Sequence, residues 1–265
     1  MKYIIDLDGT LLNGEKANLD SVEFMKYLND RNFDYLVMTN SIKSPTAIQE
    51  KLKNVGIDID VEKVMNPINA INCYLRTKGL RNAFVVGSQM EVEQLEAVIN
   101  NENPEIVILL DFEKTNVCCD KLQEVFSLTC KGVPVITASG SKFYLKNGEK
   151  VLDTGAFVSL LEAAGEITIP VFGKPSYEYF MSGLRLLNAS SREVIVIGDD
   201  WKTDIKGAMG VGCKPALIKS GKYVVGDELN VPEALCLESL MDVFQEIIDD
   251  GDVSISTKTL QLNIE

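Results

Sequence analysis

Short apolar runs alternate with longer amphipathic segments along most of the chain. These runs are rich in branched aliphatic side chains, as in strands that are buried on both faces. We expect strands at residues 3–5, 35–38, 83–86, 106–110, 133–137, 169–172, 194–197 and 216–218. Because segments of helical periodicity separate most of these runs, the pattern predicts βαβ units around a parallel sheet. The expected fold class is therefore α/β.

Turn and capping residues indicate where several elements begin and end. Pro67 stands at the first position of an expected helix, which ends at Gly79. Ser44, followed by a proline, begins another helix as its N-cap. Asn147-Gly148 is typical of a tight turn between two strands and predicts a hairpin.

The last part of the chain contains two further patterns. Apolar residues from Leu237 to Ile248 recur at helical spacing and predict a final amphipathic helix. Residues 251–265 alternate like a strand. An edge strand, a strand added to another subunit and a frayed end are all compatible with this alternation.

Composition and charge narrow the range of partners. The 265 residues include 39 acidic and 26 basic ones, which gives a net charge of −13 at pH 7. Such a negative field repels nucleic acids and anionic membranes, so we expect neither as a partner. The longest apolar run, 106–110, is far shorter than the ~20 residues of a membrane span. The first residues do not resemble a signal peptide, and the six cysteines contain no CxxC pair. We therefore expect a cytoplasmic protein whose thiols are reduced and packed in the core.

The chain contains no histidine. This excludes Ser-His-Asp and Cys-His nucleophiles, histidine-ligated zinc and a histidine general base. Any chemistry must therefore rest on carboxylates, lysines, hydroxyls, thiols or a hard metal ion.

Polar clusters follow four of the expected strands. They are Asp6-Leu7-Asp8-Gly9-Thr10, Thr39-Asn40-Ser41, Gly173-Lys174-Pro175-Ser176 and Gly198-Asp199-Asp200, the last of which continues to Thr203-Asp204. Open α/β sheets bind their ligands beyond the carboxyl ends of the strands. We therefore expect the four clusters to converge on one crevice.

Two of these clusters bring carboxylates together. Asp6 and Asp8 are two residues apart and lie on the same side of an extended chain. Because two carboxylates so close repel each other, one should stay ionised while the other holds a proton. Asp199 adds a carboxylate from a second strand end. Such oxygen ligands suit Mg²⁺ better than zinc or copper.

The other groups of the clusters suit an anion. Lys174 precedes an expected helix, whose first N–H groups also attract negative charge. Thr39 and Asn40 supply neutral donors for further anionic oxygen atoms. Acids, Mg²⁺, one lysine and neutral donors together describe a site for phosphoryl transfer. We expect Asp204 to orient metal-bound water and Asp200 to lie behind the ligands or to face solvent.

The four clusters, in this order, resemble the four motifs of the haloacid dehalogenase (HAD) superfamily. They read DLDGT, VMTNS, GKPS and GDDWKTDI. The 133 residues between Asn40 and Lys174 leave room for an inserted α/β cap domain, as in the NagD-type or 4-nitrophenylphosphatase-like branch. The resemblance implies a Rossmann-like catalytic core of residues 1–65 and 169–250, a cap of residues 66–168 and a tail of residues 251–265.

The resemblance also implies a role for each site residue. Asp6 would be the nucleophile and Asp8 the general acid and base. Mg²⁺ would be held by Asp6, the Asp8 carbonyl and Asp199, and the phosphoryl group by Thr39, Asn40 and Lys174. Asp204 would support the water shell of the metal, with Asp200 behind the ligands.

Two departures from the family pattern concern the substrate. Ser41 replaces the second Asn of the usual Thr-Asn-Asn-Ser. Residues Ala138-Ser139-Gly140-Ser141 stand where the cap usually has Thr-Asn-Pro-Asp. The resemblance implies that this loop helps to select the substrate, so the leaving group stays open.

The expected function is Mg²⁺-dependent hydrolysis of a small phosphomonoester, such as a sugar phosphate or a nucleotide monophosphate, through an aspartyl-phosphate. The partner would then be a small phosphorylated metabolite, and a homodimer is compatible with this function. Two alternatives stay open. The same site could serve a phosphotransferase or mutase, in which a hydroxyl replaces water, or the chain could be a non-catalytic sensor of phosphorylated metabolites.

Overall fold

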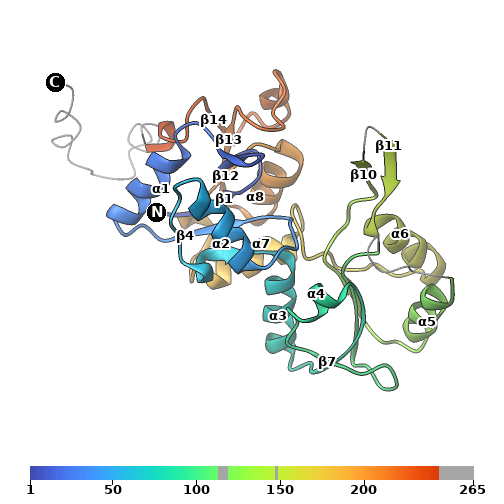
Figure 1. Cartoon of the computed structure of the whole chain (residues 1–265). Coiled ribbons are helices and arrows are strands. Elements are labelled where there is room, and N and C mark those ends of the chain that lie inside the picture. Colours follow the sequence, from blue (N-terminus) through green and yellow to red (C-terminus); the bar gives the residue numbers. More distant parts are fainter. Residues whose placement is uncertain (113–118, 147–148, 245–265) are drawn as a thin grey trace, which may run out of the picture.

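The structure contains two parallel sheets, each covered by helices (Figure 1). The computed structural model describes residues 1–112, 119–146 and 149–244. The larger sheet consists of six strands, in the order β14 (Leu235–Leu237), β13 (Lys214–Ile218), β12 (Val194–Gly198), β1 (Lys2–Asp6), β4 (Tyr35–Met38) and β5 (Val64–Met65). All neighbouring pairs in it are parallel. The predicted α/β class, with a parallel core sheet and a separate cap sheet, is confirmed.

Helices cover both faces of the larger sheet. Tyr3 and Ile5 of β1 belong to one buried cluster with residues of α1 (Ser21–Asp30) and α2 (Pro45–Asn54). Ile4 belongs to a second cluster with residues of α7 (Tyr177–Leu186) and α8 (Lys206–Val211). Successive side chains of a strand point to opposite faces, so β1 is buried on both sides. This explains why the strand is a continuous apolar run in the sequence.

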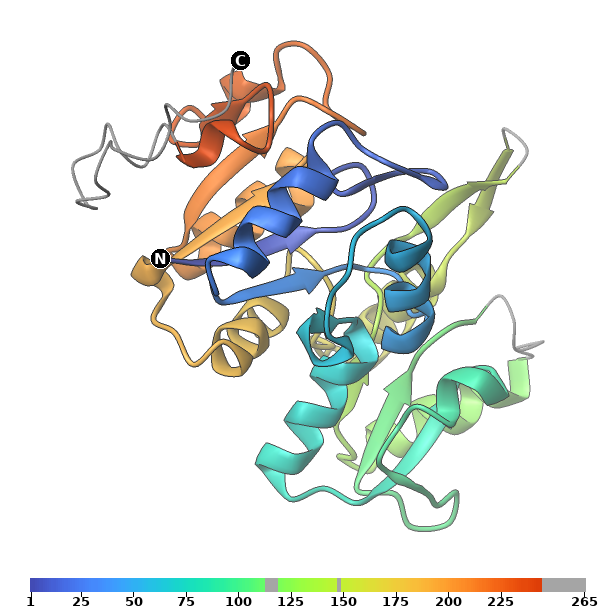
Figure 2. The ribbon, with the colours of Figure 1, turned by 60° about the vertical axis from the view of Figure 1, so that its left-hand side comes forward.

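The smaller sheet is a separate body (Figures 1 and 2). Its four parallel strands follow the order β7 (Val98–Ile99), β6 (Asn82–Val86), β8 (Ile106–Leu109) and β9 (Val135–Thr137). The same region contains α4 (Gln89–Val92), α5 (Cys119–Cys130), the hairpin of β10 (Phe143–Lys146) and β11 (Glu149–Leu152), and α6 (Thr154–Gly165). We call the described residues of 82–165 the cap. The domain boundaries at 66 and 168 stay a prediction.

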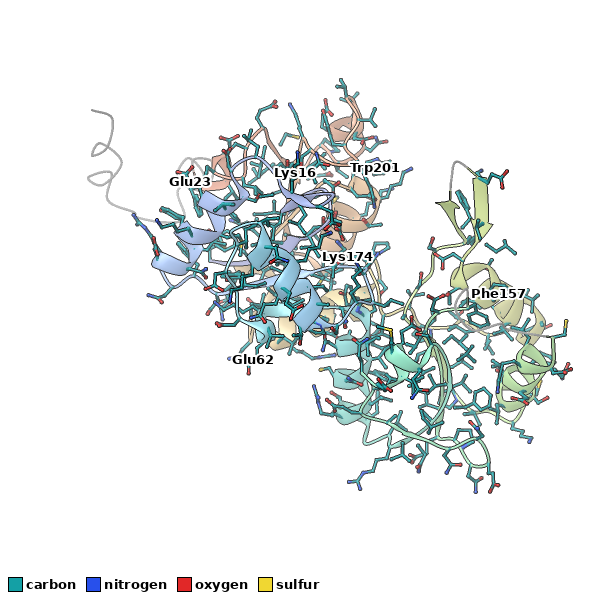
Figure 3. The ribbon with its side chains drawn as sticks, in the orientation of Figure 1. Lys16, Glu23, Glu62, Phe157, Lys174 and Trp201 are labelled. Atoms are coloured by element: carbon teal, nitrogen blue, oxygen red, sulfur yellow. The ribbon has the colours of Figure 1, made fainter. Side chains whose placement is uncertain are left out.

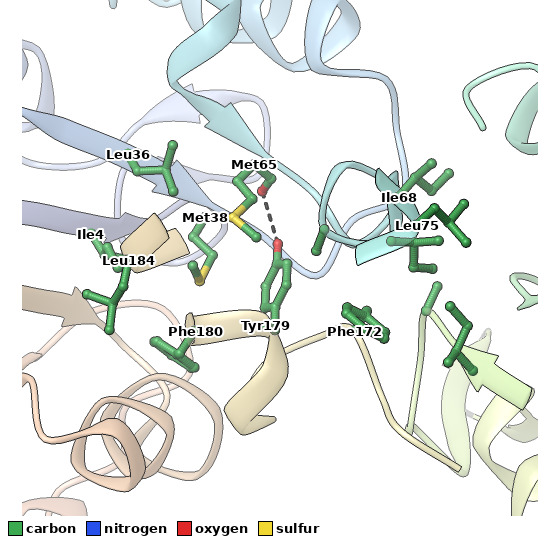
Figure 4. Packing of buried hydrophobic residues seen from close by; sticks show 14 of the residues in the cluster. Ile4, Leu36, Met38, Met65, Ile68, Leu75, Phe172, Tyr179, Phe180 and Leu184 are labelled. Carbon is green, nitrogen blue, oxygen red and sulfur yellow. Dashed lines mark hydrogen bonds between the residues drawn. The ribbon is translucent and has the colours of Figure 1, made fainter. Parts of the chain in front are cut away.

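Helix α3 (Pro67–Lys78) connects the two sheets. Its residues Ile68 and Leu75 belong to one buried cluster with Leu36 of the larger sheet (Figure 4). Ile106 of the cap belongs to the same cluster. The core and the cap therefore share part of one hydrophobic interior. The remaining short elements are the strands β2 (Leu12–Asn13) and β3 (Lys16–Ala17) and single helical turns at Val61–Lys63, Ser191–Glu193, Trp201–Ile205 and Asp227–Asn230.

Several local predictions are confirmed. The Ser44 hydroxyl accepts a hydrogen bond from Ala47 N (3.3 Å) at the start of α2. Helix α3 begins at Pro67 and stops at Gly79. The expected hairpin pairs Phe143 with Leu152, while its turn lies outside the described residues. No helix within the described residues has the length and apolar character needed to cross a membrane.

One predicted strand, at residues 169–172, is wrong. Only Val171 pairs there, in an isolated bridge with Thr137. Pro170 has no N–H to donate, so the pairing cannot continue as a regular ladder. The third polar cluster therefore follows a loop instead of a strand.

Two further expectations need correction. Leu237 is the last residue of β14 and does not begin a helix. Residues 238–241 form bends and turns, and only residues 242–244 of the expected helix are helical. The last residues of that helix, 245–248, and the tail at 251–265 lie outside the described residues. Among the described cysteines, only Cys213 is buried, so the expected core role of the thiols is wrong for the others.

Candidate active site

The polar clusters meet at the carboxyl ends of three adjacent strands. Asp6 is the last residue of β1, Thr39 follows β4 and Asp199 follows β12. A cavity of about 110 Å³ lies there. It is lined by all the predicted site residues except Asp200, together with Ser41, Thr203 and Lys222. The structure thus brings the predicted residues together at one place.

Lys174 is one of the residues that line this cavity and is only 8% exposed (Figure 3). Its ammonium group forms an ion pair with Asp6 Oδ1 and lies 2.6 Å from Asp204 Oδ1. Burial lowers the pKa of Lys174, but the negative charges of Asp204 and Asp6 outweigh this and raise the pKa above its ordinary value. Lys174 is therefore a permanent positive charge beside Asp6.

Three buried acids surround this lysine. Carboxylate oxygens of Asp6, Asp199 and Asp204 all lie within 4.8 Å of one another. Burial raises the pKa of Asp199 to about 6, and the charge of Asp6 adds to the rise. Burial also raises the pKa of Asp204 to about 7, although Lys174 opposes this. When ionised, the three acids carry more negative charge than the positive charge of Lys174 can balance.

This donor set fits a divalent cation. Asp6 Oδ2 is buried and has no hydrogen-bond partner among the described residues. An unpartnered buried carboxylate oxygen is costly unless it receives a proton, a ligand or a metal ion. Clustered carboxylate oxygens without nitrogen or sulfur ligands favour Mg²⁺. The acids present here therefore fit the predicted metal.

Two glycines give the Asp199 carboxylate its space. Gly9 and Gly221 have φ angles of +104° and +54°, and a Cβ atom on them would lie 2.0 and 2.1 Å from Asp199 Oδ2. Only glycine combines this backbone with so close an approach. Lys222 N donates a hydrogen bond of 2.6 Å to the same oxygen, so the backbone fixes this carboxylate.

Asp8 has a different environment from Asp6. Its side chain is 55% exposed at the rim of the cavity, and its Oδ1 atom lies 3.6 Å from Lys51 Nζ. Lys51 comes from α2 and also pairs with Glu15 at 3.5 Å. Sequence reasoning missed Lys51 because a lysine inside an amphipathic helix has no local sign of a distant partner. Asp6 and Asp8 look alike in the sequence but differ in exposure, since Asp6 is buried and Asp8 is largely exposed.

The second and third clusters hold each other. Lys174 N donates to Asn40 Oδ1 at 2.7 Å, and Asn40 Nδ2 donates to Lys174 O at 3.0 Å. This pairing places Lys174 in the cavity although no regular strand precedes it. The Asn40 amide keeps one N–H for another partner.

Tyr179, on helix α7, contacts the backbone of Thr39, the residue before Asn40. Its buried hydroxyl lies 2.5 Å from Thr39 O and 3.0 Å from Met65 O, and it can donate to either carbonyl (Figure 4). The Thr39 hydroxyl accepts a hydrogen bond from Ser41 N at 3.0 Å. Tyr179 was not predicted, since an aromatic residue on an apolar helix face reads as ordinary core.

Asp200 lies outside the cavity lining. Its Oδ1 atom accepts a hydrogen bond from Lys202 N at 2.9 Å, and its Oδ2 atom lies 3.3 Å from Lys222 Nζ. Lys222 also lines the cavity, but it comes from the loop after β13 and belongs to none of the four polar clusters in the sequence. It was therefore not predicted as a site residue. Asp200 therefore positions Lys222 and a helical turn in this structure.

Comparison with known proteins supports one family. A family model described as haloacid dehalogenase-like hydrolase matches residues 3–99, and one described as HAD-hydrolase-like matches residues 171–243. The chain is 30% identical over 232 residues to the phospholysine phosphohistidine inorganic pyrophosphate phosphatase of Danio rerio, covering 85% of each chain. It is 28% identical over 248 residues to the Homo sapiens haloacid dehalogenase-like hydrolase domain-containing protein 2, covering 92% of this chain and 95% of that one.

Solved structures show the same fold. The p-nitrophenyl phosphatase from Archaeoglobus fulgidus superposes with a TM-score of 0.83 at 19% identity, covering 92% of this chain and 98% of that one. NagD from Escherichia coli K-12 superposes with a TM-score of 0.80 at 22% identity, covering 90% and 96%. The chain therefore belongs to the haloacid dehalogenase-like hydrolases, with the fold of NagD and the p-nitrophenyl phosphatases.

Proposed function

We propose that the chain is a Mg²⁺-dependent phosphatase of small phosphomonoesters and that Asp6 is its nucleophile. One observation carries this proposal. Lys174 holds Asp6 Oδ1, whereas the second oxygen, Oδ2, is buried without a hydrogen-bond partner in a cavity of about 110 Å³. A carboxylate fixed through one oxygen, with the other free, suits attack on a phosphorus atom that is held in line.

In the first step, Asp6 attacks the phosphorus atom and the bond from phosphorus to the ester oxygen breaks. Lys174 and Thr39 bind the phosphoryl oxygens and stabilise the charge that develops on them. Asp8, at the exposed rim, protonates the departing alkoxide. The product of this step is an aspartyl-phosphate on Asp6 and a free alcohol.

In the second step, water hydrolyses the aspartyl-phosphate. Asp8, now ionised, takes a proton from the water as it attacks phosphorus, and the Asp6 carboxylate leaves. Asp6, the Asp8 carbonyl and Asp199 would hold Mg²⁺, with Asp204 and Asp200 behind them. When bound, the ion supplies positive charge to the phosphoryl oxygens and offsets the three buried acids.

The names of the relatives support a phosphoester substrate. The Danio rerio relative is named as a phosphatase, as is the Archaeoglobus fulgidus protein of the same fold. These names differ in substrate, so they support a phosphoester substrate without defining its leaving group. A cytoplasmic location and a homodimer stay predictions.

Phosphate release from p-nitrophenyl phosphate tests the proposal. The purified full chain should release phosphate when Mg²⁺ is present. No turnover should be measurable after EDTA is added, and none should be measurable in the Asp6→Asn variant. Transfer of the phosphoryl group to an added alcohol without phosphate release would instead support a phosphotransferase. Binding of phosphorylated metabolites without turnover would support a sensor and contradict the proposal.

A further inference from the structure

A second cavity, of about 700 Å³, adjoins the small one and shares Asn40, Lys174, Thr203 and Lys222 with it. A phosphomonoester bound with its phosphoryl group in the small cavity would therefore extend its leaving group into the larger one. Its volume is within the usual range of small-molecule sites. The cap contributes residues 138–141 and Asp153 to the wall.

Backbone hydrogen bonds fix this part of the wall. Ala138 N donates to Leu109 O at 2.9 Å, and Gly155 N donates to Ser141 O at 2.8 Å. The Ser139 hydroxyl accepts a hydrogen bond from Ser141 N at 3.2 Å and keeps its own proton for another acceptor. The loop therefore offers a fixed hydroxyl group to the cavity.

Asp153 is the only acid in the described lining of the larger cavity. Its Oδ1 atom accepts a hydrogen bond from Thr154 N at 2.7 Å at the start of α6, which fixes the side chain. The two lysines of the lining come from the core and already pair with acids, Lys174 with Asp204 and Lys222 with Asp200. Within the described lining, no cation of the cap offsets the charge of Asp153.

The kinds of side chain also limit the leaving group. The described lining contains no aromatic ring on which a nucleobase or a pyridine ring could stack. It contains serine and threonine hydroxyls and one carboxylate. A carboxylate accepts hydrogen bonds from hydroxyl groups and repels a second anion.

We infer that the substrates are monophosphates of small, uncharged polyols or sugars, and that Asp153 selects them. Asp153 accepts a hydrogen bond from a hydroxyl of the leaving group and repels substrates whose leaving group carries a carboxylate or a second phosphate. This inference rests on the proposed phosphatase function and adds the substrate class to it.

A matched pair of substrates tests the role of Asp153. Glycerol 3-phosphate and 3-phosphoglycerate have the same carbon chain and differ in one end, a CH₂OH group against a carboxylate. With Mg²⁺, the full chain should prefer glycerol 3-phosphate in kcat/KM by about tenfold or more. Asp153→Asn should reduce this preference at least about fivefold, because asparagine still caps α6 but carries no charge.

Glu102→Gln is the control. It removes the same charge from an exposed cap loop before β8. This loop lies at the amino ends of the parallel cap strands, whereas residues 138–141 follow the carboxyl end of β9. The substrate preference should not change in this variant. An unchanged preference in Asp153→Asn, or an equal change in Glu102→Gln, would overturn the inference. If one of these two results is found while the unsubstituted chain hydrolyses p-nitrophenyl phosphate, the role of Asp153 is contradicted and the proposed phosphatase function still holds. If the chain hydrolyses no phosphate ester at all, the proposed function itself is contradicted.

Discussion

Asn40 and Lys174 are 134 positions apart in the chain and hold each other through two hydrogen bonds. The amide of Asn40 accepts from Lys174 N and donates to Lys174 O, at 2.7 and 3.0 Å. Lys174 in turn pairs with Asp6. Through this contact the loop after β4 determines where the positive charge stands beside the proposed nucleophile.

Asn40→Ala should therefore lower kcat/KM about 100-fold, because a small displacement of Lys174 disturbs both Asp6 and the bound phosphoryl group. The measurement is steady-state hydrolysis of p-nitrophenyl phosphate at saturating Mg²⁺. Asn54→Ala, at the exposed end of α2, is the matched control and should keep full activity. Full activity of Asn40→Ala would show that the two hydrogen bonds are not needed to position Lys174.

Tyr179→Phe should lower the free energy of unfolding by about 1–3 kcal/mol, since the Thr39 carbonyl loses the Tyr179 hydroxyl as a donor, whereas Met65 O still accepts from Thr39 N at 3.1 Å. Urea denaturation followed by circular dichroism measures this change. The control is Tyr177→Phe, whose side chain is 57% exposed and which should change stability by less than about 0.5 kcal/mol. Equal effects of the two variants would contradict the role given to the Tyr179 hydroxyl.

The order of polar clusters after apolar runs was enough to predict much of this site. Asp6, Thr39 and Asp199 follow strands that the apolar pattern marks well, and parallel strands bring their carboxyl ends to one edge. The same reasoning failed at residues 169–172, where Pro170 prevents a regular strand. Lys174 nevertheless reaches the cavity because Asn40 holds its backbone.

Residues that act from elsewhere in the fold could not be predicted. Lys51 lies on a helix, Lys222 in a loop after β13, and Tyr179 on a buried helix face. Each meets the site only through tertiary packing, and none stands in a pattern that differs from ordinary surface or core. The different burial of Asp6 and Asp8 is likewise a tertiary property.

Mg²⁺ should bind less tightly as the pH falls through 7 and then 6. The pKa of Asp204 is raised to about 7 and that of Asp199 to about 6, so protonated forms of both persist into this range. A proton on Asp199 competes with the metal for a proposed ligand oxygen, and a proton on Asp204 removes negative charge from behind the ligands. Affinity should therefore fall by up to about tenfold per pH unit for each proton displaced. Isothermal titration calorimetry at pH 8, 6.5 and 5 in buffers of different ionisation enthalpy measures affinity and proton release. Equal affinity at pH 8 and pH 5 without proton release would contradict this prediction.

The central claim is that Asp6 and Asp8 have different roles, the first as nucleophile and the second as proton donor and acceptor. Stopped-flow absorbance of Asp6→Asn and Asp8→Asn with p-nitrophenyl phosphate tests it most directly. Nitrophenolate leaves without help from an acid, whereas hydrolysis of the aspartyl-phosphate needs Asp8 as a base. Asp8→Asn should therefore release about one equivalent of nitrophenolate per enzyme in a rapid burst, followed by slow turnover, whereas Asp6→Asn should release none. A burst from Asp6→Asn, or the absence of any burst from Asp8→Asn together with full steady-state turnover, would contradict the account.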